Sequence, residues 1–320
     1  MKKFLLISGL VMFVILGSIA GYGYYMYSSV QNTVDNKMHV TVDREKSEKR
    51  ELEVDIEDQE PLSFLLMGVD TGNGRTEKGR TDTIMVVTVN PADESMKMMS
   101  IPRDTRTEMV GRGTDDKINH AYAFGGPEMA MATVENFLDI PIDYFMTVNM
   151  DGFKDIVDAL GGVTVDNNFA FKQGAYEFNE GTVNLDGSQA LEFSRMRYED
   201  PRGDLGRNER QRQVVDAIIR EGAQFSSITK AGEILDALGN NISTDLTFDK
   251  MVKIQSNYKD ARHNSETLEI TGSGSRINNI WYYIVEENER QRVSNELRAH
   301  LGLDGGEQVA VSDDGEDDES

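Results

Sequence analysis

The sequence predicts an α/β fold, a single αβα domain with a mixed central sheet covered by helices, preceded by one transmembrane helix. Apolar runs of strand length alternate along the chain with segments of helical periodicity, which is typical of a sheet with helices on both faces. The stretch that carries this alternation, residues 61–301, has the size of one domain and shows no internal repeat. An uncharged segment of bilayer-spanning length stands before it.

The first segment is apolar between Phe4 and Tyr27, and Lys2 and Lys3 stand before it. Positive charge before the span and acid-rich chain after it predict a cytoplasmic N-terminus and an extracytoplasmic body. A cleaved signal peptide is the alternative, because Ser18–Ala20 resembles a small-residue cleavage site. The length of the apolar run and its terminal tyrosines favour an uncleaved anchor, so we expect a single-pass protein of the cell membrane.

Composition divides the chain into four parts. Residues 1–27 hold the cytoplasmic end and the anchor, and residues 28–60 are polar with charges of both signs, as expected of an extracytoplasmic stalk. Residues 61–301 form the main domain. Residues 302–320 end in SDDGEDDES and are expected to be disordered, because so acidic a segment buries too little apolar surface to fold.

The elements of the main domain follow from periodicity and end signals. The expected strands are the apolar runs LSFLLMGVD (62–70), DTIMVVTVN (82–90), MKMMSIP (96–102), DYFMTVNM (143–150), VTVD (163–166), TLEITG (267–272) and IWYYIV (280–285). The expected helices are 127–139, 151–162, 186–197, 206–225, 231–238, 248–258 and a last one through His300. Pro127 suits a helix start, Asp186 a helix cap, and Gly161 and Gly162 a helix end.

The overall composition excludes several kinds of function. The formal net charge is −23, and a nucleic-acid partner would require a basic surface from which counterions are released, so no nucleic acid is expected. The chain has no cysteine, which excludes disulfides, a thiol nucleophile and thiolate metal ligands.

Arginine is nevertheless concentrated in SRMRYEDPRGDLGRNERQRQ, Ser194 to Gln213, where lysine is absent. The planar guanidinium fork matches phosphate oxygens better than an ammonium group does. Arg195 and Arg197 precede a break in the helical pattern, and Arg207 and Gln211 share one face of the helix that follows. Together with the free N–H groups of that helix start, they could form an anion clamp. A solvated face of ion pairs is the alternative interpretation.

Two strand ends carry further charges. GVDTGNGRTEKGRTDTIM places Asp70 at the end of one strand and Arg80 and Asp82 at the start of the next. Ligands bind at strand ends in open α/β sheets, and two carboxylates suit a divalent ion such as Mg²⁺. The proline of SIPRDTRTEM ends strand pairing directly before Arg103, and Lys117 follows in DDKINHAYAFGG. Each segment alone reads as an ordinary charged turn, but together they would accommodate a diphosphate and one divalent ion.

A series of motifs lies between residues 64 and 224, in the order LLMGVD, GRTDTIMV, SIPRDT, KINHAYAFGG, VNMDGFKDIVDALGGV and LDGSQALEFSRMRYEDPRGDLGRNERQRQV. In sequence, order and spacing these motifs resemble the LytR–CpsA–Psr family of membrane-anchored cell-wall enzymes. The chain after about Gly239 matches no motif of the family, and the acidic tail lies outside its pattern.

The resemblance implies that residues 61–301 are a catalytic domain facing the cell wall. It implies a Mg²⁺-assisted phosphotransferase, in which Mn²⁺ could replace Mg²⁺. This enzyme would move an anionic glycopolymer, wall teichoic acid or a capsule-like polymer, from a polyprenyl-diphosphate carrier to peptidoglycan. The alternatives are a polyprenyl-diphosphate hydrolase, which would use the same site with water, and a non-catalytic envelope protein that binds polymers or regulates.

The resemblance also assigns roles to residues, with Asp70 and Asp82 as the metal ligands. The catalytic residues implied by the resemblance are Asp70, Arg80, Asp82 and Arg103. The implied diphosphate-binding residues are Arg80, Arg103, Lys117, Arg195, Arg197, Arg207 and Gln211. Asp204 matches an acid of the arginine-rich motif. From their positions around the helix, Arg210 and Arg212 are expected to be structural or solvated.

Overall fold

The computed structural model describes residues 25, 27–44, 46–70, 79–222, 239 and 241–303. Their centre is a six-stranded sheet in the order β11-β6-β1-β2-β3-β12. The strands are β1 (Leu62–Asp70), β2 (Arg80–Asn90), β3 (Ser95–Ser100), β6 (Tyr144–Asn149), β11 (Ile242–Thr244) and β12 (Asn264–Thr267). β1 runs antiparallel to β2 and parallel to β6, and β12 runs parallel to β3. The expected α/β fold with a mixed sheet is confirmed.

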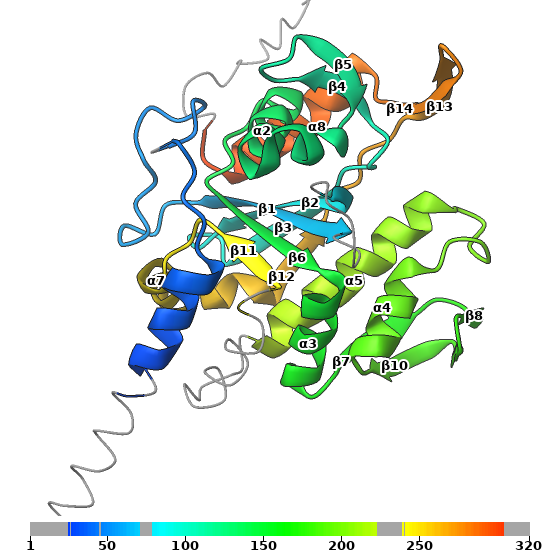
Figure 1. Ribbon diagram of the computed structural model, residues 1–320, viewed down its shortest axis with the longest axis horizontal. Helices are drawn as coiled ribbons and strands as arrows, with labels where there is room; N and C mark the ends of the chain where they lie inside the picture. The colour runs from blue at the N-terminus through cyan, green and yellow to red at the C-terminus, as the bar shows by residue number, and fades with distance from the viewer. Residues whose placement is uncertain are drawn as a thin grey trace, which may run out of the picture.

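Helices cover both faces of this sheet (Figure 1). One face carries α2 (His120–Leu138) and α8 (Glu287–His300), and the other carries α3 (Met150–Leu160), α5 (Asp204–Gly222) and α7 (Phe248–Tyr258). Side chains alternate along a strand, so Met67 and Val69 of β1 join the core beneath α2 and α8, whereas Leu66 packs with side chains of α5. A strand that is buried on both faces reads as the continuous apolar run seen in the sequence.

A smaller layer lies between α3 and α5 in the chain. It contains β7 (Val163–Asn167) paired with β10 (Gly181–Leu185), β8 (Phe171–Gln173) paired with β9 (Tyr176–Phe178), and α4 (Gly187–Arg195). Phe171, Phe178 and Phe193 form its aromatic core, with ring centroids 4.9 to 5.5 Å apart. Asp186 caps α4 with a capping box, as its position in the sequence predicts.

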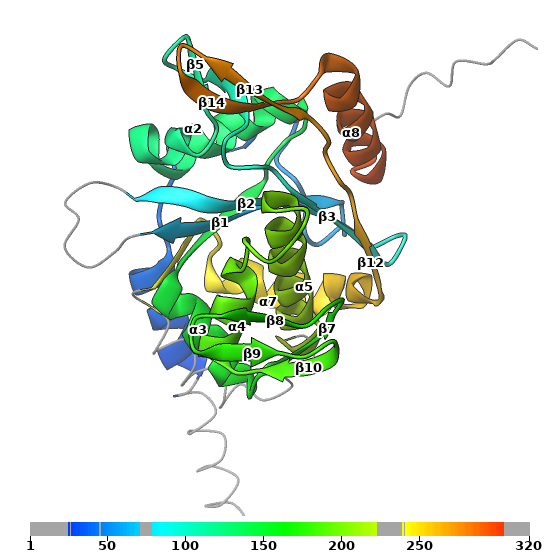
Figure 2. The same ribbon diagram turned by 90° about the vertical axis from the view of Figure 1, so that its right-hand side faces the viewer.

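Two hairpins lie together on the α2 side of the sheet (Figure 2). They are β4 (Arg106–Met109) with β5 (Thr114–Lys117), and β13 (Ser273–Ile277) with β14 (Ile280–Ile284). The structure also has two short helical segments, η1 (Val34–Met38), a π-helix, and η2 (Lys259–His263), a 3₁₀ helix.

Several elements differ from the sequence prediction. The helix expected from Pro127 begins at His120, and Gly126, with φ 69° and ψ −157°, interrupts it so that Pro127 opens the second segment. Strand β12 covers Asn264–Thr267 rather than residues 267–272, although the N–H of Leu268 still donates to the carbonyl oxygen of Met98 at 2.9 Å, and Leu268 and Ile270 are buried in the core that α2 and α8 cover. The short strands β4, β5, β8, β9, β10, β11 and β13 were not predicted, and GSGSRI at β13, for example, has no apolar alternation. The helix expected over 231–238 lies outside the described residues.

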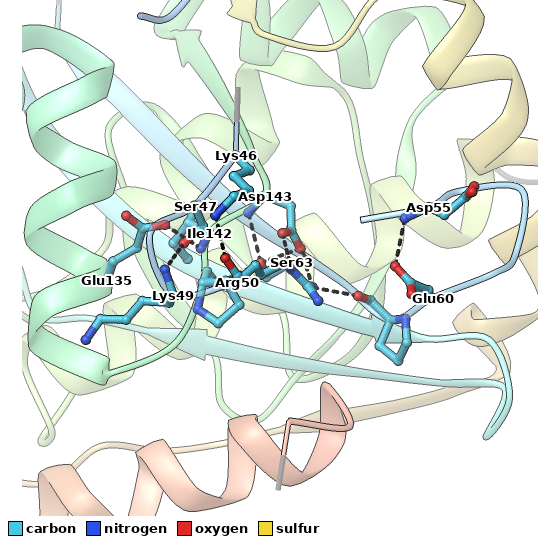
Figure 3. Close-up of polar contacts among 12 residues, drawn as sticks. Lys46, Ser47, Lys49, Arg50, Asp55, Glu60, Ser63, Glu135, Ile142 and Asp143 are labelled. Atoms are coloured by element: carbon cyan, nitrogen blue, oxygen red, sulfur yellow. Dashed lines mark hydrogen bonds and ion pairs between the residues drawn. The ribbon is translucent and has the colours of Figure 1, made fainter. Parts of the chain in front are cut away.

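The segment expected to be a stalk, residues 28–60, is packed against the domain where it is described, which differs from that expectation. Val30, Val34 and Met38 are buried with side chains of β11 and α7. Farther along, Arg50 makes a bidentate ion pair with Asp143 at 2.6 and 2.8 Å, and the two side chains are 10 % and 4 % exposed (Figure 3). The few apolar residues of this segment are spaced among charges, so composition alone makes it look like a solvated linker.

The expected membrane anchor lies almost entirely in residues 1–24, outside the part of the chain that the structure describes. Within the described part, no helix combines the length and the apolarity needed to span a bilayer. Residues 304–320 of the acidic tail also lie outside the described part.

Candidate active site

The strand ends that carry Asp70 and Asp82 meet at a β-bulge. Asp70 pairs with Arg80, but the register shifts between Gly68 and Val69, so that Asp82 has no residue opposite it. A bulge of this kind redirects side chains and is common next to active sites. The backbones approach so closely here that a Cβ at Gly79 would lie 2.2 Å from the carbonyl oxygen of Asp70.

The loop after β3 brings Arg103 to this bulge. A tight turn follows the strand, in which the N–H of Thr105 donates to the carbonyl oxygen of Pro102 at 2.9 Å. Arg103 Nη1 donates to Asp82 Oδ1 at 2.7 Å. Asp104 links this pair to Lys117. Its Oδ2 lies 3.7 Å from Arg103 Nε, and its Oδ1 lies 2.7 Å from Lys117 Nζ. A chain of alternating charges therefore runs from β2 to β5.

The start of α5 contributes a second group of charges. Asp204 Oδ1 lies 3.2 Å from Arg197 Nε and 3.0 Å from Arg207 Nη1. The side chain of Arg207 is only 12 % exposed, and its Nε is buried with no hydrogen-bond partner among the described residues. A buried guanidinium N–H without a partner is costly, and an anionic ligand would satisfy it.

The two groups form one electrostatic cluster of Asp82, Arg103, Arg197, Asp204 and Arg207. Burial lowers the pKa of Arg207; the charges of Arg103 and Arg197 act in the same direction, and those of Asp204 and Asp82 act against it. Burial would also lower the pKa of Arg103, but the ion pair with Asp82 and the charge of Asp204 outweigh it and raise that pKa. The cluster concentrates positive charge that two carboxylates hold in place, which suits a ligand with several negative charges.

A buried ion pair supports the loop between α4 and α5. Arg210 Nη1 lies 2.6 Å from Asp200 Oδ2, with side-chain exposures of 5 % and 0 %, and Arg210 Nη2 donates to the carbonyl oxygen of Met196 at 2.6 Å. Only glycine fits at position 206, because a Cβ there would lie 1.8 Å from Asp200 Oδ2. Arg210 is therefore a structural residue, as expected. Arg212 is also buried, 3.6 Å from Glu269.

Five residues assigned from the sequence are outside this cluster: Asp70 and Lys117, described above, and Arg80, Arg195 and Gln211. Arg195 lies 3.2 Å from Glu192 and places its Nη2 2.7 Å from the sulfur of Met150. Arg80 is exposed opposite Asp70 in the strand register. Gln211 lies one helical turn after Arg207, on the same side of α5. Sequence reasoning gave no role to Asp104 and Asp200, whose only signal was their place beside arginines in SIPRDT and YEDPRG.

The acids at the bulge fit a Mg²⁺ ion that shares a phosphate ligand. Within the described residues, no group of three or more His, Cys, Asp or Glu side chains could hold a metal ion. Mg²⁺ is commonly bound by one or two carboxylates, with water and substrate phosphates supplying the other oxygens. Asp82 uses one oxygen for Arg103 and is 43 % exposed, so its second oxygen can face such a ligand. Asp70 and Asp82 could therefore hold such an ion only together with further oxygen ligands.

A separate polar cavity of about 170 Å³ lies between residues 39–54 and a group of residues at the start of β6 and near α7. Asp245 lines this cavity, and its Oδ1 accepts a hydrogen bond from the N–H of Phe145 at 2.9 Å. Burial raises the pKa of Asp245 to about 6, against the smaller lowering effects of that hydrogen bond and of Arg44 and Lys250.

Asp245 is therefore expected to make stability depend on pH. Because its folded-state pKa lies above the unfolded value, this group destabilises the protein above pH 6, and stability rises as the pH falls through 6 toward 4. Asp245→Asn should raise the free energy of unfolding at pH 7.5 by up to about 3 kcal/mol, with a smaller gain at pH 5. Urea unfolding at the two pH values measures this, with Asp249→Asn, an exposed acid on α7, as the control. An equal effect of Asp245→Asn at both pH values would contradict it.

Comparison with known proteins identifies the family of the chain. The model of the LytR_cpsA_psr family matches residues 24–299. The chain belongs to the LytR_cpsA_psr family. The match extends well beyond residues 64–224, where the motifs lie.

Several members of the LytR_cpsA_psr family resemble the chain closely. A protein of Halalkalibacterium halodurans named polyisoprenyl-teichoic acid–peptidoglycan teichoic acid transferase TagU is 58 % identical over 305 residues, which are 95 % of this chain and 100 % of that protein. The crystal structure of Bacillus subtilis TagU matches with 48 % identity and a TM-score of 0.63, over 76 % of this chain and 97 % of that chain. The family protein YwtF (TagT) with bound octaprenyl pyrophosphate lipid matches with 29 % identity and a TM-score of 0.66, over 82 % of this chain and 100 % of that chain.

Proposed function

We propose that this protein is a phosphotransferase that moves an anionic glycopolymer from a polyprenyl-diphosphate carrier to peptidoglycan. The observation that carries the proposal is the convergence of Arg103, Arg197 and Arg207 on Asp82 and Asp204 at the strand ends. The positive charge of this cluster complements the negative charge of a diphosphate. The family relatives named as teichoic acid transferases, and the relative with a bound prenyl pyrophosphate, support wall teichoic acid as the polymer class.

The reaction requires positioning and charge stabilisation rather than a covalent enzyme intermediate. A hydroxyl of peptidoglycan attacks the phosphorus that carries the glycopolymer and loses its proton, a new P–O bond forms, and the bond to the polyprenyl phosphate breaks. Arg103, Arg197 and Arg207 would hold the diphosphate and stabilise the negative charge that grows on the leaving phosphate. Mg²⁺ held by Asp70 and Asp82 would add further charge neutralisation there.

The decisive experiment is a transfer assay with the full-length protein in detergent. The donor is a synthetic polyprenyl-diphosphate-linked teichoic acid precursor, and the acceptor is peptidoglycan freed of its native teichoic acid. The proposal predicts polymer attached to peptidoglycan and release of polyprenyl phosphate that depends on the acceptor. Equal release of polyprenyl phosphate without peptidoglycan would instead identify a hydrolase, and retention of intact donor would identify a binding protein.

Asp82→Asn tests the metal proposal, because it keeps the shape of the side chain and removes its charge. Transfer should fall by at least about tenfold, the loss of one charged interaction, while the melting temperature stays near that of the wild type. Calorimetric titration of Mg²⁺ into the protein with a short-chain polyprenyl diphosphate should show weaker binding in the variant. Asp115→Asn, which removes a similarly exposed acid 2.6 Å from Arg106, is the matched control. Full activity of Asp82→Asn in chelator-treated buffer would rule out the metal role.

We also propose that residues 4–27 anchor the protein in the cell membrane with the catalytic domain outside. The support is the uncharged apolar run that follows Lys2 and Lys3. A protease that cannot enter intact cells should degrade the domain and leave a cytoplasmic control protein whole. Protection of the domain, or a mature N-terminus near Gly21, would contradict the anchored topology.

A further inference from the structure

The β13–β14 hairpin is joined to the loop that carries Arg103. The N–H of Tyr283 in β14 donates to the carbonyl oxygen of Asp104 at 2.9 Å. The ammonium group of Lys117, which pairs with Asp104, lies 5.9 Å from the ring centroid of Tyr282. Asp104 is thus bonded to Tyr283 directly and linked to Tyr282 by Lys117, and its carboxylate lies 3.7 Å from Arg103. The hairpin therefore has a fixed position beside the candidate active site.

Trp281, the single tryptophan of the chain, lies near the tip of this hairpin and is 39 % exposed. Asn278 and Asn279 form the two-residue turn, and both have positive φ, 50° and 66°, as the turns favoured by hairpins require. The indole lies against Gly274, where a Cβ would be 3.0 Å from Trp281 Nε1. The ring is therefore seated on the backbone of β13, with part of its surface left to solvent.

The surroundings of Trp281 combine an aromatic surface with a fork of hydrogen-bond donors. Arg276 is the cross-strand partner of Trp281, so the two side chains stand on the same face of the hairpin. Arg276 Nη1 donates to the carbonyl oxygen of Asn279 at 3.3 Å, which positions the guanidinium group. An aromatic ring stacks on the C–H face of a pyranose sugar, and arginine pairs with carboxylates. Peptidoglycan glycan strands present both, as pyranose rings and as the carboxylates of their lactyl and peptide groups.

We propose that Trp281 and Arg276 form the surface on which the acceptor glycan strand of peptidoglycan rests. This inference rests on the proposed function and names the place where its acceptor binds. Peptidoglycan is a covalent network that cannot enter the interior of a domain, so an element that projects from the surface has to reach it. The hairpin projects in this way from the α2 side of the sheet (Figure 1). The donor, by contrast, is held through its diphosphate.

Co-sedimentation with purified sacculi tests this surface in the full-length protein in detergent. The sacculi are freed of teichoic acid, and isolated teichoic acid is titrated separately. Trp281→Ala should weaken sedimentation with stripped sacculi by about tenfold and raise the KM for peptidoglycan with little change in kcat. Trp281→Phe should retain most of the binding. Ile280→Ala, which removes a neighbouring exposed side chain from the opposite face of the hairpin, is the control.

The outcomes separate this inference from the proposed function. If Trp281→Ala sediments like the wild type, or loses binding only to isolated teichoic acid, the acceptor surface is wrong even where transfer occurs. If the wild type shows no transfer but binds stripped sacculi through Trp281, the proposed reaction fails and the glycan surface stands. An equal loss of sedimentation in Ile280→Ala would show a general effect on the hairpin and would also overturn the assignment.

Discussion

Replacement of Arg207 by alanine should weaken the binding of a polyprenyl diphosphate by about ten- to a hundredfold and should lower transfer in parallel. A hydrogen bond from a charged group is worth about 1.5–3 kcal/mol, which corresponds to that range. Arg207 is 12 % exposed, and its Nε is buried without a partner in the described part of the chain, so the ligand would find a donor that is already desolvated. Arg207→Lys should restore little, because an ammonium group lacks the planar fork.

The control for Arg207 is Arg220→Ala on the same helix. Arg220 is 52 % exposed and lies 3.1 Å from Asp216, and an exposed ion pair contributes at most about 1 kcal/mol. Titration with a short-chain polyprenyl diphosphate in Mg²⁺ measures binding, and thermal melts confirm that both variants are folded. If the two variants bind the diphosphate equally well, the cluster at the start of α5 is not a ligand site.

Removal of Arg210 should cause the largest loss of stability, about 3–5 kcal/mol. Arg210→Ala would take from the carboxylate of Asp200, which is 0 % exposed, its buried ion-pair partner at 2.6 Å, and leave it the half-exposed Arg202 at 3.4 Å. The melting temperature should fall by roughly 2–4 °C for each kcal/mol in a domain of this size, hence by about 10 °C. Transfer activity should fall as well, because this pair holds the loop between α4 and α5 on which Arg197 and Asp204 are placed.

A double-mutant cycle identifies the origin of that loss. The variant Asp200→Ala with Arg210→Ala should be less destabilised than the sum of the single variants, because no unpaired charge then remains buried. Arg202→Ala removes an arginine that is 48 % exposed, paired with Glu209 and only 3.4 Å from Asp200 Oδ1, while the backbone N–H at position 202 still donates to that carboxylate, so it should cost under about 1 kcal/mol. A loss of similar size for Arg202→Ala and Arg210→Ala in urea unfolding would contradict the assignment of Arg210 to the structural core.

The helices of the main domain, and the strands that form apolar runs, were predictable because their signals are local. The runs around β1 and β3 are apolar on both faces, α7 was expected over the residues it occupies, and Asp186 has the spacing of a capping box. Predictions were wrong where distant contacts decide the conformation. Strand β12 lies three residues earlier than its apolar run because it pairs with β3 from Asn264, and β13 exists because its polar residues pair with the apolar β14.

The sequence by itself determined the residue types of the site, the motifs that place the chain in its family, and the concentration of arginine between Ser194 and Gln213. Only the tertiary structure decided which arginines act together. Arg103 and Arg207 belong to segments far apart in the chain and meet only because α5 begins near the loop that follows β3, whereas Arg210, three residues from Arg207, turns inward to Asp200. Helical geometry fixes the side on which an arginine stands, but burial and a buried partner determine whether its charge is available to a ligand.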